Sequence, residues 1–393
     1  MKTAFVEQKG PNLVRVDALL KLCEQKNHWA NRGPVYRLLQ DRLNAYLDLP
    51  EGCSAVPVSN GGVALEVMAR LHAKRKGAKL RWVASAYSFQ NLGRGYFADV
   101  RFADCDAGGL LSLAALDALD PESYDGVIVT NPFGLYADLS AFGDFARRTG
   151  KALLVDNAAG FFKDIPDLPW QAFSLHHTKP FGMGEGGVAL VPEEDEEALY
   201  ALVNYGREIT EEDRAHWFQN GKISDLSCAM LLDRLEQAGE WVPRNLAQRD
   251  RVIALAGDVG LRPLFQPETG IPMTSMPFLC PRPVSEAAAD RTRFATFAKY
   301  YRPLADLPNV TAIYRHLLNI PCHGDMARLS DDQILADLFD MGAVSARPQS
   351  HRPVPSKPRC QSSALPVAAD QNRPEEHKAY GGYRDVAKPL PRS

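Results

Sequence analysis

Short apolar runs alternate with helical or glycine-rich stretches over the first half of the chain. Strands that alternate with helices form a mostly parallel sheet that helices cover on both faces. We therefore expect an α/β fold with a mostly parallel seven-stranded sheet between helices. The last two runs are joined by a loop too short for a long helix, which predicts a hairpin there. The seven runs are residues 55–58, 80–84, 100–103, 127–130, 152–155, 172–175 and 188–191.

Polar residues, glycines and one aromatic residue follow the ends of these runs. In open α/β sheets, ligands bind beyond the carboxyl ends of the strands. The sequence therefore predicts one functional site at this edge of the sheet. The residues in question are Asn60 to Gly62, Ser88, Phe89, Asn131, Asp156 and Ser174.

Lys179 lies in the stretch 172-AFSLHHTKPFGMGEGG-187, between an apolar run and a glycine-rich loop. An amine attacks carbonyls only when unprotonated, so a catalytic lysine needs either an enclosed site that lowers its pKa or a carbonyl cofactor that binds it as a Schiff base. Asp156 follows the run ALLV, where an unpaired carboxylate is costly to bury. Pairing it with a protonated pyridine nitrogen would remove that cost. Together the two residues suggest pyridoxal phosphate; the alternative for Asp156 is a helix N-cap.

FSLHHTKPFGMGEGG resembles the lysine motif of the DegT/StrS sugar aminotransferase family, a group of fold-type-I pyridoxal-phosphate enzymes. LLVDNAAG, with its aspartate 23 residues before Lys179, resembles the cofactor aspartate motif of that family. The resemblance runs from about Asn31 to about Met326. In a related branch that dehydrates sugars, histidine stands at the lysine position, so Lys179 argues against that branch.

The resemblance implies which residues bind the cofactor phosphate. The turn Ser59-Asn60-Gly61-Gly62 is similar to the phosphate turn of the family, and backbone amides at a helix N-terminus suit an anion. Gly62 stands where the family usually has threonine. Ser174 matches a serine that contacts the phosphate. A simple chain reversal is the alternative for the Gly-Gly turn.

The resemblance also implies contacts to the cofactor ring. Phe89 matches an aromatic residue that stacks on the pyridine ring, and its alternative is a core residue. Asp156 would keep the ring protonated. Ala159 replaces a usual glutamine that contacts the ring hydroxyl, and Asn131 replaces a common histidine.

Asn220, in 220-NGKISDL-226, resembles an asparagine that reaches the cofactor phosphate of the neighbouring subunit. If the match holds, the resemblance implies an obligate homodimer with shared active sites. The alternative is a simple turn at residues 220–222 followed by Ser224 as a helix N-cap.

The substrate contacts are the least determined part of the site. The loop 27-NHWANRGPV-35 resembles a Gly-Pro loop near the substrate in the family, which makes Trp29, Asn31 and Gly33 candidates. The alternative is a turn with a packed tryptophan. His176 is a further candidate for a substrate contact, with a structural histidine as its alternative, and Glu185 is expected to be a structural partner of the loop.

Apolar residues at helical spacing predict helices over residues 12–26 and 35–49. From Ser224 the pattern is helical for some thirty residues, and Pro243 is expected to kink or split that helix. Residues 260–343 are expected to be α+β, and their elements are a strand at 276–280 and helices at 294–304 and 331–339.

We expect three regions: a large cofactor-binding α/β domain (1–245), a small α+β domain (246–343) and a proline-rich basic tail (344–393). The tail holds eight of the 28 prolines and has a charge of +5. It carries too few apolar residues to offset the entropy cost of ordering and is expected to be irregular.

Composition limits the possible partners and compartments of the chain. At 393 residues it is long enough for two or three structural units, and its net charge of −3 does not point to nucleic acid or an anionic membrane. Seven scattered cysteines without a CxxC pair argue against a disulfide framework or a metal site and fit the cytoplasm. No run of about 18 apolar residues occurs, and the N-terminus lacks the apolar core of a signal peptide, so no membrane segment is expected.

The motifs together predict a pyridoxal-phosphate aminotransferase with Lys179 and Asp156 as catalytic residues. From the resemblance, glutamate would donate the amino group to a nucleotide-linked keto sugar, in surface polysaccharide or secondary-metabolite biosynthesis. The alternative is a catalytically divergent cofactor-binding scaffold or regulatory protein of the same fold, because Gly62, Ala159 and Asn131 depart from the family pattern.

Overall fold

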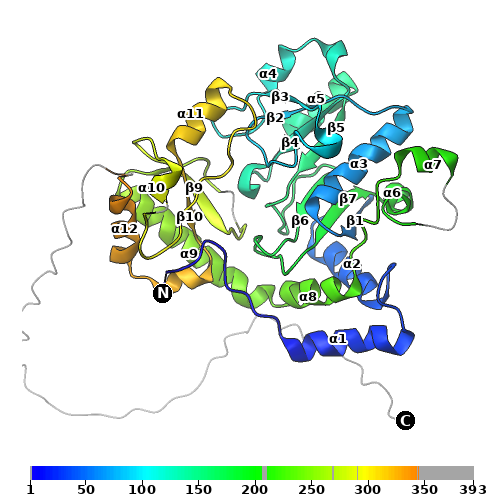
Figure 1. The fold of residues 1–393 in the computed structure, drawn as a ribbon, viewed down its shortest axis with the longest axis horizontal. Helices are drawn as coiled ribbons and strands as arrows, with labels where there is room; N and C mark the ends of the chain where they lie inside the picture. The colour runs from blue at the N-terminus through cyan, green and yellow to red at the C-terminus, as the bar shows by residue number, and fades with distance from the viewer. Residues whose placement is uncertain (1, 206–209, 268–269, 290, 343, 345–393) are drawn as a thin grey trace, which may run out of the picture. The chain divides into compact units, whose positions relative to one another are not determined.

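A seven-stranded sheet forms the centre of the larger part of the fold (Figure 1), in the order β1-β7-β6-β5-β4-β2-β3. The computed structural model describes residues 2–205, 210–267, 270–289, 291–342 and 344. The expected tail, 344–393, therefore lies outside the described residues except for Val344. The strands are β1 (Cys53–Val58), β2 (Trp82–Ser85), β3 (Arg101–Ala103), β4 (Gly126–Thr130), β5 (Ala152–Asp156), β6 (Gln171–Ser174) and β7 (Gly187–Pro192).

Each of the seven predicted runs forms one of these strands, so the expected sheet is confirmed. Strands β2 to β6 pair in parallel. Strand β7 runs antiparallel to both β6 and β1. The predicted hairpin between β6 and β7 is therefore confirmed.

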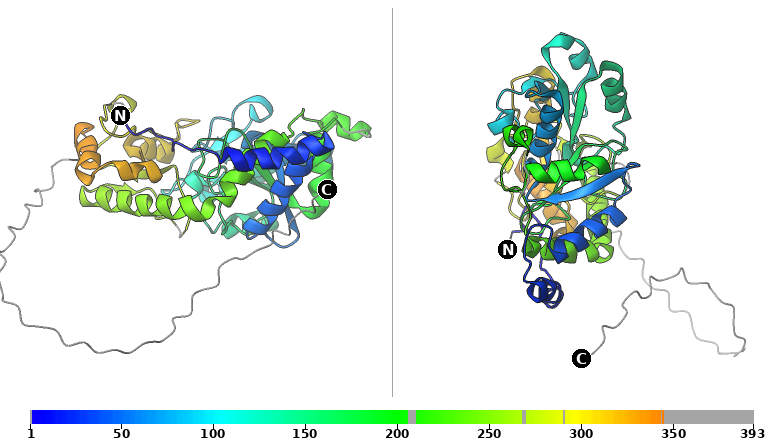
Figure 2. Two further views of the ribbon diagram at one scale, coloured as in Figure 1. Left: turned by 90° about the horizontal axis from the view of Figure 1, so that it is seen from below. Right: turned by 90° about the vertical axis from the view of Figure 1, so that its right-hand side faces the viewer.

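The strands read as continuous apolar runs because both faces of the sheet are buried. Alternate residues of a strand enter different cores: Ala172 packs with α3, whereas Phe173 packs with α1, α2 and α8. Figures 1 and 2 show these helices on opposite sides of the sheet. The helices of this part are α1 (Leu13–Lys26), α2 (Pro34–Tyr46), α3 (Gly61–Lys76), α4 (Leu113–Asp117), α5 (Ser140–Thr149), α6 (Glu196–Leu202), α7 (Glu211–His216) and α8 (Asp225–Glu236).

A small antiparallel sheet of order β10-β9-β8 organises the later part of the chain. The expected strand at 276–280 is β9, and the expected helix at 331–339 is α12, which begins with a capping box formed by Ser330 and Gln333. The elements are α9 (Ala238–Asp258), β8 (Arg262–Pro263), β9 (Ser275–Leu279), α10 (Glu286–Ala289), α11 (Pro308–His316), β10 (Leu317–Pro321) and α12 (Asp331–Asp340).

The helix predicted at residues 294–304 is wrong. Its first backbone N–H groups donate to a distant side chain, because the Asp337 carboxylate accepts from Phe294 and Ala295. Further along, Ala298 exchanges backbone hydrogen bonds with Asn319 of β10. Tertiary partners have therefore replaced the local helical pattern.

The expected split of the helix at Pro243 is wrong, whereas a kink at Pro243 stays a prediction. The helical stretch breaks at Gln237, between α8 and α9, and Pro243 lies inside α9. Proline lacks an N–H, so it removes the helical bond to the carbonyl of Gly239. The expected domain boundary at residues 245 and 246 falls inside the same helix and stays a prediction.

The N-terminal residues cross from the small sheet to α1. Thr3 forms a bridge with Ala295 beside the small sheet. The backbone N–H of Asn12, the N-cap of α1, donates to the Asp233 carboxylate of α8 at 2.9 Å. Among the described helices, none is long and apolar enough to span a membrane.

Candidate active site

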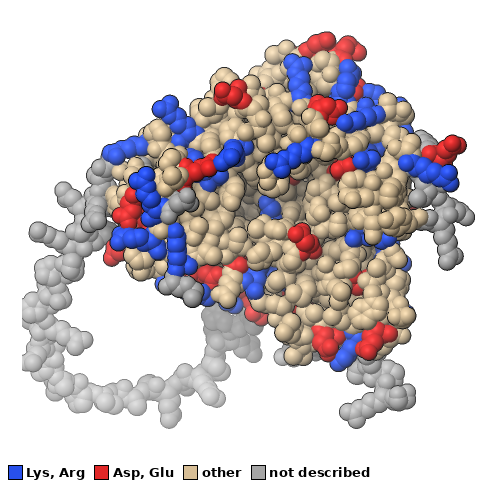
Figure 3. Space-filling model, in the orientation of Figure 1, with Lys and Arg blue, Asp and Glu red and all other residues tan. Residues whose placement is uncertain are grey.

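A cavity of about 550 Å³ opens at the carboxyl ends of β4, β5 and β6. Thr130, Asp156 and Ser174 end these three strands, and all of them line it. The face drawn in Figure 3 is hollowed near its centre, and most charged side chains lie around that hollow. The predicted site residues that line the cavity are Asn60, Gly61, Gly62, Phe89, Asn131, Asp156, Ala159, Ser174, His176 and Lys179.

Lys179 and Asp156 both line this cavity, Asp156 buried and Lys179 partly buried, and they act on each other's ionisation. Burial lowers the pKa of the Lys179 amine, and the negative charge of Asp156 opposes that shift. Burial raises the pKa of the Asp156 carboxyl, and Lys179 opposes that shift. A lysine with a lowered pKa holds more of the neutral amine that reacts with carbonyls.

The Asp156 carboxylate accepts one backbone hydrogen bond, from Ala158 at 3.2 Å. No helix begins here, because residues 157–165 are turns and irregular structure. The helix N-cap alternative is therefore wrong. A buried carboxylate with so little hydrogen bonding fits a cationic partner such as a pyridinium nitrogen.

The turn at residues 60–62 begins α3, a helix of 16 residues. Asn60 is its N-cap, and its side chain accepts from the Val63 N–H at 2.9 Å. A Cβ on Gly61 would lie 3.0 Å from the Ser174 Cβ, so glycine lets the helix start approach the end of β6. The N-terminal amides of α3 and the Ser174 hydroxyl thus lie at one place, where an anion is favoured.

Aromatic rings form one wall of the cavity. Phe89 is half exposed, so the alternative that it is a core residue is wrong. Its ring meets Tyr301 edge-on at 6.4 Å, and Tyr301 stacks on Phe133 at 4.9 Å. A planar ligand ring would find an aromatic face here.

The model of the DegT/DnrJ/EryC1/StrS aminotransferase family matches residues 15–269, which is more than half of the chain. The chain belongs to this family. Family membership makes it a pyridoxal-phosphate-dependent aminotransferase, so the resemblance drawn from the motifs is confirmed.

Curated relatives and solved structures agree with that assignment. Protein Rv3402c of Mycobacterium tuberculosis (strain ATCC 25618 / H37Rv) is 27% identical over 369 residues, covering 83% of this chain and 87% of that protein. L-glutamine:scyllo-inosose aminotransferase of Streptomyces griseus is 27% identical over 56% of each chain. The structure of PseC from Helicobacter pylori, an aminotransferase involved in the biosynthesis of pseudoaminic acid, covers 87% of this chain and 98% of its own with a TM-score of 0.71 and 15% identity, a likeness of fold.

The residues present fit the family's cofactor. Lys179 supplies an amine that can bind a carbonyl, and Asp156 supplies a buried carboxylate that can pair with a ring nitrogen. The start of α3 supplies backbone amides that can bind a phosphate. Phe89 supplies an aromatic face in the same cavity. Within the described residues, no cluster of three His, Cys, Asp or Glu suits a metal ion.

Asn131, where the family often has histidine, is buried and bonded to the protein itself. Its side-chain amide donates to the Tyr136 carbonyl at 2.7 Å and to Asn157 Oδ1 at 3.1 Å, and its Oδ1 accepts from the Tyr136 N–H. These bonds hold the loop after β4. The departure at this position thus has a structural explanation.

His176 lies at the wall of the cavity together with Glu185. Its Nε2 is 3.6 Å from a Glu185 carboxylate oxygen, and its Nδ1 is 2.9 Å from the Thr178 hydroxyl. Both side chains are partly exposed, which leaves them accessible to a substrate. The substrate role of His176 stays a prediction.

The loop with Trp29, Asn31 and Gly33 does not line this cavity. Gly33 is the N-cap of α2, and a Cβ there would lie 2.5 Å from a carboxylate oxygen of Asp225. Asp225 caps α2 by accepting from the Val35 N–H at 2.8 Å. Glycine is therefore required at residue 33 because a larger side chain would meet Asp225. The substrate role of the loop stays a prediction.

Asn220 is exposed and also lies outside the lining of this cavity. Ser224 is the N-cap of α8 and accepts from the Ser227 N–H at 3.2 Å, so the predicted helix cap is confirmed. A contact of Asn220 with a second subunit stays a prediction.

Several lining residues escaped prediction from the sequence. Thr130 and Phe133 flank Asn131, and the rule that sites follow strand ends would have included them. Phe5 and Tyr301 do not follow a predicted strand. Phe5 lies near the N-terminus, and Tyr301 lies in the stretch that was wrongly predicted as a helix. The unpredicted lining residues include Phe5, Val6, Asn91, Thr130, Phe133, Met273, Thr274, Ser275, Tyr300 and Tyr301.

Restoring the hydroxyl at residue 62 should strengthen cofactor binding. A Cβ on Gly62 meets only the Asn60 Oδ1, at 3.2 Å, so Gly62→Thr requires a small shift of that side chain. One added hydrogen bond should contribute about 0.5–1.5 kcal/mol, or roughly 2- to 10-fold in cofactor affinity. Titration of the apo-protein measures the gain, with Gly62→Val as the matched control without a hydroxyl. Equal affinities of the two variants would contradict the prediction.

Proposed function

We propose that this aminotransferase moves an amino group from glutamate to a keto sugar, which the motif resemblance suggests is nucleotide-linked. The observation that carries the proposal is the burial of Lys179 and Asp156 in one cavity at the start of α3. The sugar part rests on the family, and a cyclic polyhydroxy ketone is the substrate named for the Streptomyces griseus relative. Surface polysaccharide or secondary-metabolite biosynthesis would be the setting.

The chain's own residues would divide the work as follows. Pyridoxal phosphate, when bound, supplies a carbonyl carbon for amines and a ring that accepts electrons. Asp156 would hold a proton on the ring nitrogen, and Lys179 would hold the cofactor and then move a proton at the reacting carbon. Ser174 and the amides of Gly61 and Gly62 would bind the phosphate. Phe89 and Tyr301 would orient the ring and exclude water.

A spectroscopic titration tests this proposal. Purified holoprotein should show a visible cofactor band that disappears when glutamate is added and returns when a keto sugar is added. Glutamine serves as a second donor, because the Streptomyces griseus relative is named for it. A bound cofactor that responds to no amino donor would overturn the proposal in favour of the scaffold or regulatory role.

The proposal includes a homodimer in which Asn220 serves the neighbouring active site. Several large apolar side chains are exposed on or beside α1, α2 and α8, as on a surface that a partner covers; they are Leu13, Val14, Trp29, Leu38 and Leu226. Mixing Lys179→Ala and Asn220→Ala subunits should restore about a quarter of native activity, since half of the dimers are hybrids with one intact site. No recovery above the separate variants would contradict shared sites.

A further inference from the structure

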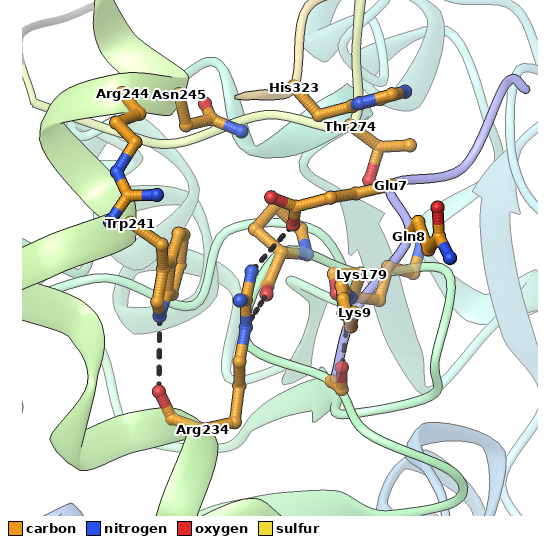
Figure 4. Close-up of polar contacts among 12 residues, drawn as sticks. Glu7, Gln8, Lys9, Lys179, Arg234, Trp241, Arg244, Asn245, Thr274 and His323 are labelled. Atoms are coloured by element: carbon orange, nitrogen blue, oxygen red, sulfur yellow. Dashed lines mark hydrogen bonds and ion pairs between the residues drawn. The ribbon is translucent and has the colours of Figure 1, made fainter. Parts of the chain in front are cut away.

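The loop that carries Lys179 is held from outside by a second lysine (Figure 4). The amine of Lys9 donates to the carbonyl oxygens of His177 at 2.7 Å, of Gly182 at 2.8 Å and of Lys179 itself. A protonated lysine has three N–H donors, and here each of them has one acceptor. All three acceptors are backbone atoms of the loop, so Lys9 fixes its path on both sides of Lys179.

Arg234 of α8 holds the same loop beside Lys9. Its Nε donates to the Pro180 carbonyl at 3.0 Å, and its guanidinium donates to the Glu7 carboxylate at 2.6 Å. The guanidinium also lies over the Trp241 ring at 3.9 Å. Arg234 is buried, so its geometry is set by packing, and Glu7 ties the N-terminal segment to it.

The third contact comes from the small antiparallel sheet. The hydroxyl of Thr274, next to β9, donates to the Thr178 carbonyl at 2.6 Å. Donors from three distant parts of the chain therefore bind carbonyls along residues 177–182. Of these three side chains, Lys9 is the one that reaches the carbonyl of Lys179, which also accepts from the backbone N–H of Gly182 at 2.9 Å.

The segment that carries Lys9 also forms part of the cavity wall. Phe5 and Val6 line the cavity, and they lie four and three residues before Lys9. Upstream, Thr3 bonds to the backbone beside the small sheet; downstream, Asn12 bonds to α8. The segment is thus bound at both ends and at Lys9 in between.

We propose that Lys9 is a positioning residue of the transamination site: its ammonium group holds the Lys179 loop and the N-terminal wall of the cavity in one arrangement. The inference rests on the proposed function for the reaction, whereas the contacts of Lys9 with the loop involve atoms of this chain alone. Lys9 acts through the backbone of the loop and is not among the residues that line the cavity.

The ionisation of Lys9 determines the conditions of a test. Burial lowers the pKa of Lys9 to about 7; Arg234 acts in the same direction, and Glu7 opposes it. Below that pH the amine carries three donors, and a neutral amine carries two. Measurements at pH 6 therefore examine the complete contact.

Hydrogen exchange of the apo-protein at pH 6 tests the positioning role directly. Three amides report on the loop, because His177, Lys179 and Gly182 donate to carbonyls within residues 176–184. Lys9→Met keeps most of the aliphatic stem and should raise exchange of these amides by roughly 10- to 100-fold, the range for lost hydrogen bonds to a charged group. Lys2→Met, an exposed lysine of the same segment, should leave them unchanged.

Two further measurements complete the test on holoprotein. Lys9→Met should lower kcat by roughly 10-fold or more while the cofactor content stays near native, because a misplaced reacting group costs rate rather than binding. Lys9→Arg keeps the charge and should recover part of both losses. Unchanged exchange in the loop of Lys9→Met, or an equal rise in the central strands β4 and β5, would overturn the proposal. A raised loop exchange in a protein whose cofactor ignores every donor would uphold the positioning role and reject the proposed function.

Discussion

Replacing Lys179 by alanine should reduce turnover by at least about 1,000-fold, because the variant loses both the amine that holds the cofactor and the group that moves the proton. Lys179 lines the cavity with Asp156, and burial of its amine lowers the pKa. A lowered pKa leaves more of the neutral amine that reacts with carbonyls. Steady-state assays with glutamate and a keto sugar, together with the cofactor spectrum, measure the loss.

Lys179→Met is the matched control for packing. It fills the space of the lysine stem and lacks only the amine, so it should be as inactive as Lys179→Ala while unfolding like the native apo-protein. Turnover within about 10-fold of native in either variant would show that another group does this chemistry.

Replacing Asp156 by asparagine should lower kcat by about 100- to 1,000-fold, the usual effect of removing one charge from a preorganised site. Asparagine has the same shape, so the change removes the negative charge and little else. Cofactor binding should weaken as well, since the ring nitrogen loses its partner. Rapid mixing with the amino donor separates the chemical step from cofactor loss.

Although Asp156→Asn should lower kcat and cofactor affinity, it should raise the free energy of unfolding of the apo-protein. Burial raises the pKa of Asp156, and the attraction of Lys179 only partly opposes it. A group whose folded-state pKa is raised binds more protons when folded, so native stability falls as pH rises from the ordinary aspartate pKa through the folded one. The Asp156→Asn variant has no carboxyl to ionise at this position, so it does not lose stability in this way. Its free energy of unfolding should exceed that of the native apo-protein by roughly 1 kcal/mol at neutral pH. Urea unfolding of both apo-proteins between pH 4 and 7 checks this, and a less stable variant at pH 7 would contradict it.

The fold was predictable where burial leaves a periodic pattern in the chain. The strands β4 and β5 are buried on both faces and read as apolar runs, and the residues after them, such as Asp156, fall at one edge of the sheet. The loop with Lys179 was predictable for the same reason, since it joins two such runs.

Residues 294–304 show where that pattern fails. Their apolar spacing favours a helix, but Asn319 accepts from the Ala298 and Tyr300 N–H groups that a helix would use. The Asp337 carboxylate binds N–H groups just before them. Those partners lie far along the chain, so no local signal reveals them. The aromatic residue Tyr301, which lines the cavity, was missed with them.

The sequence by itself determined the sheet, the family and the pair Lys179 and Asp156, because strand burial and cofactor chemistry act on short stretches. Only the tertiary structure decided what surrounds Lys179. Lys9 and Thr274 lie far from this loop in the sequence, on either side of it, and carbonyl groups carry no side-chain signal that would predict such donors. Long-range hydrogen bonds to backbone depend on the finished packing, which is why the contacts to the loop of Lys179 are visible only in the fold.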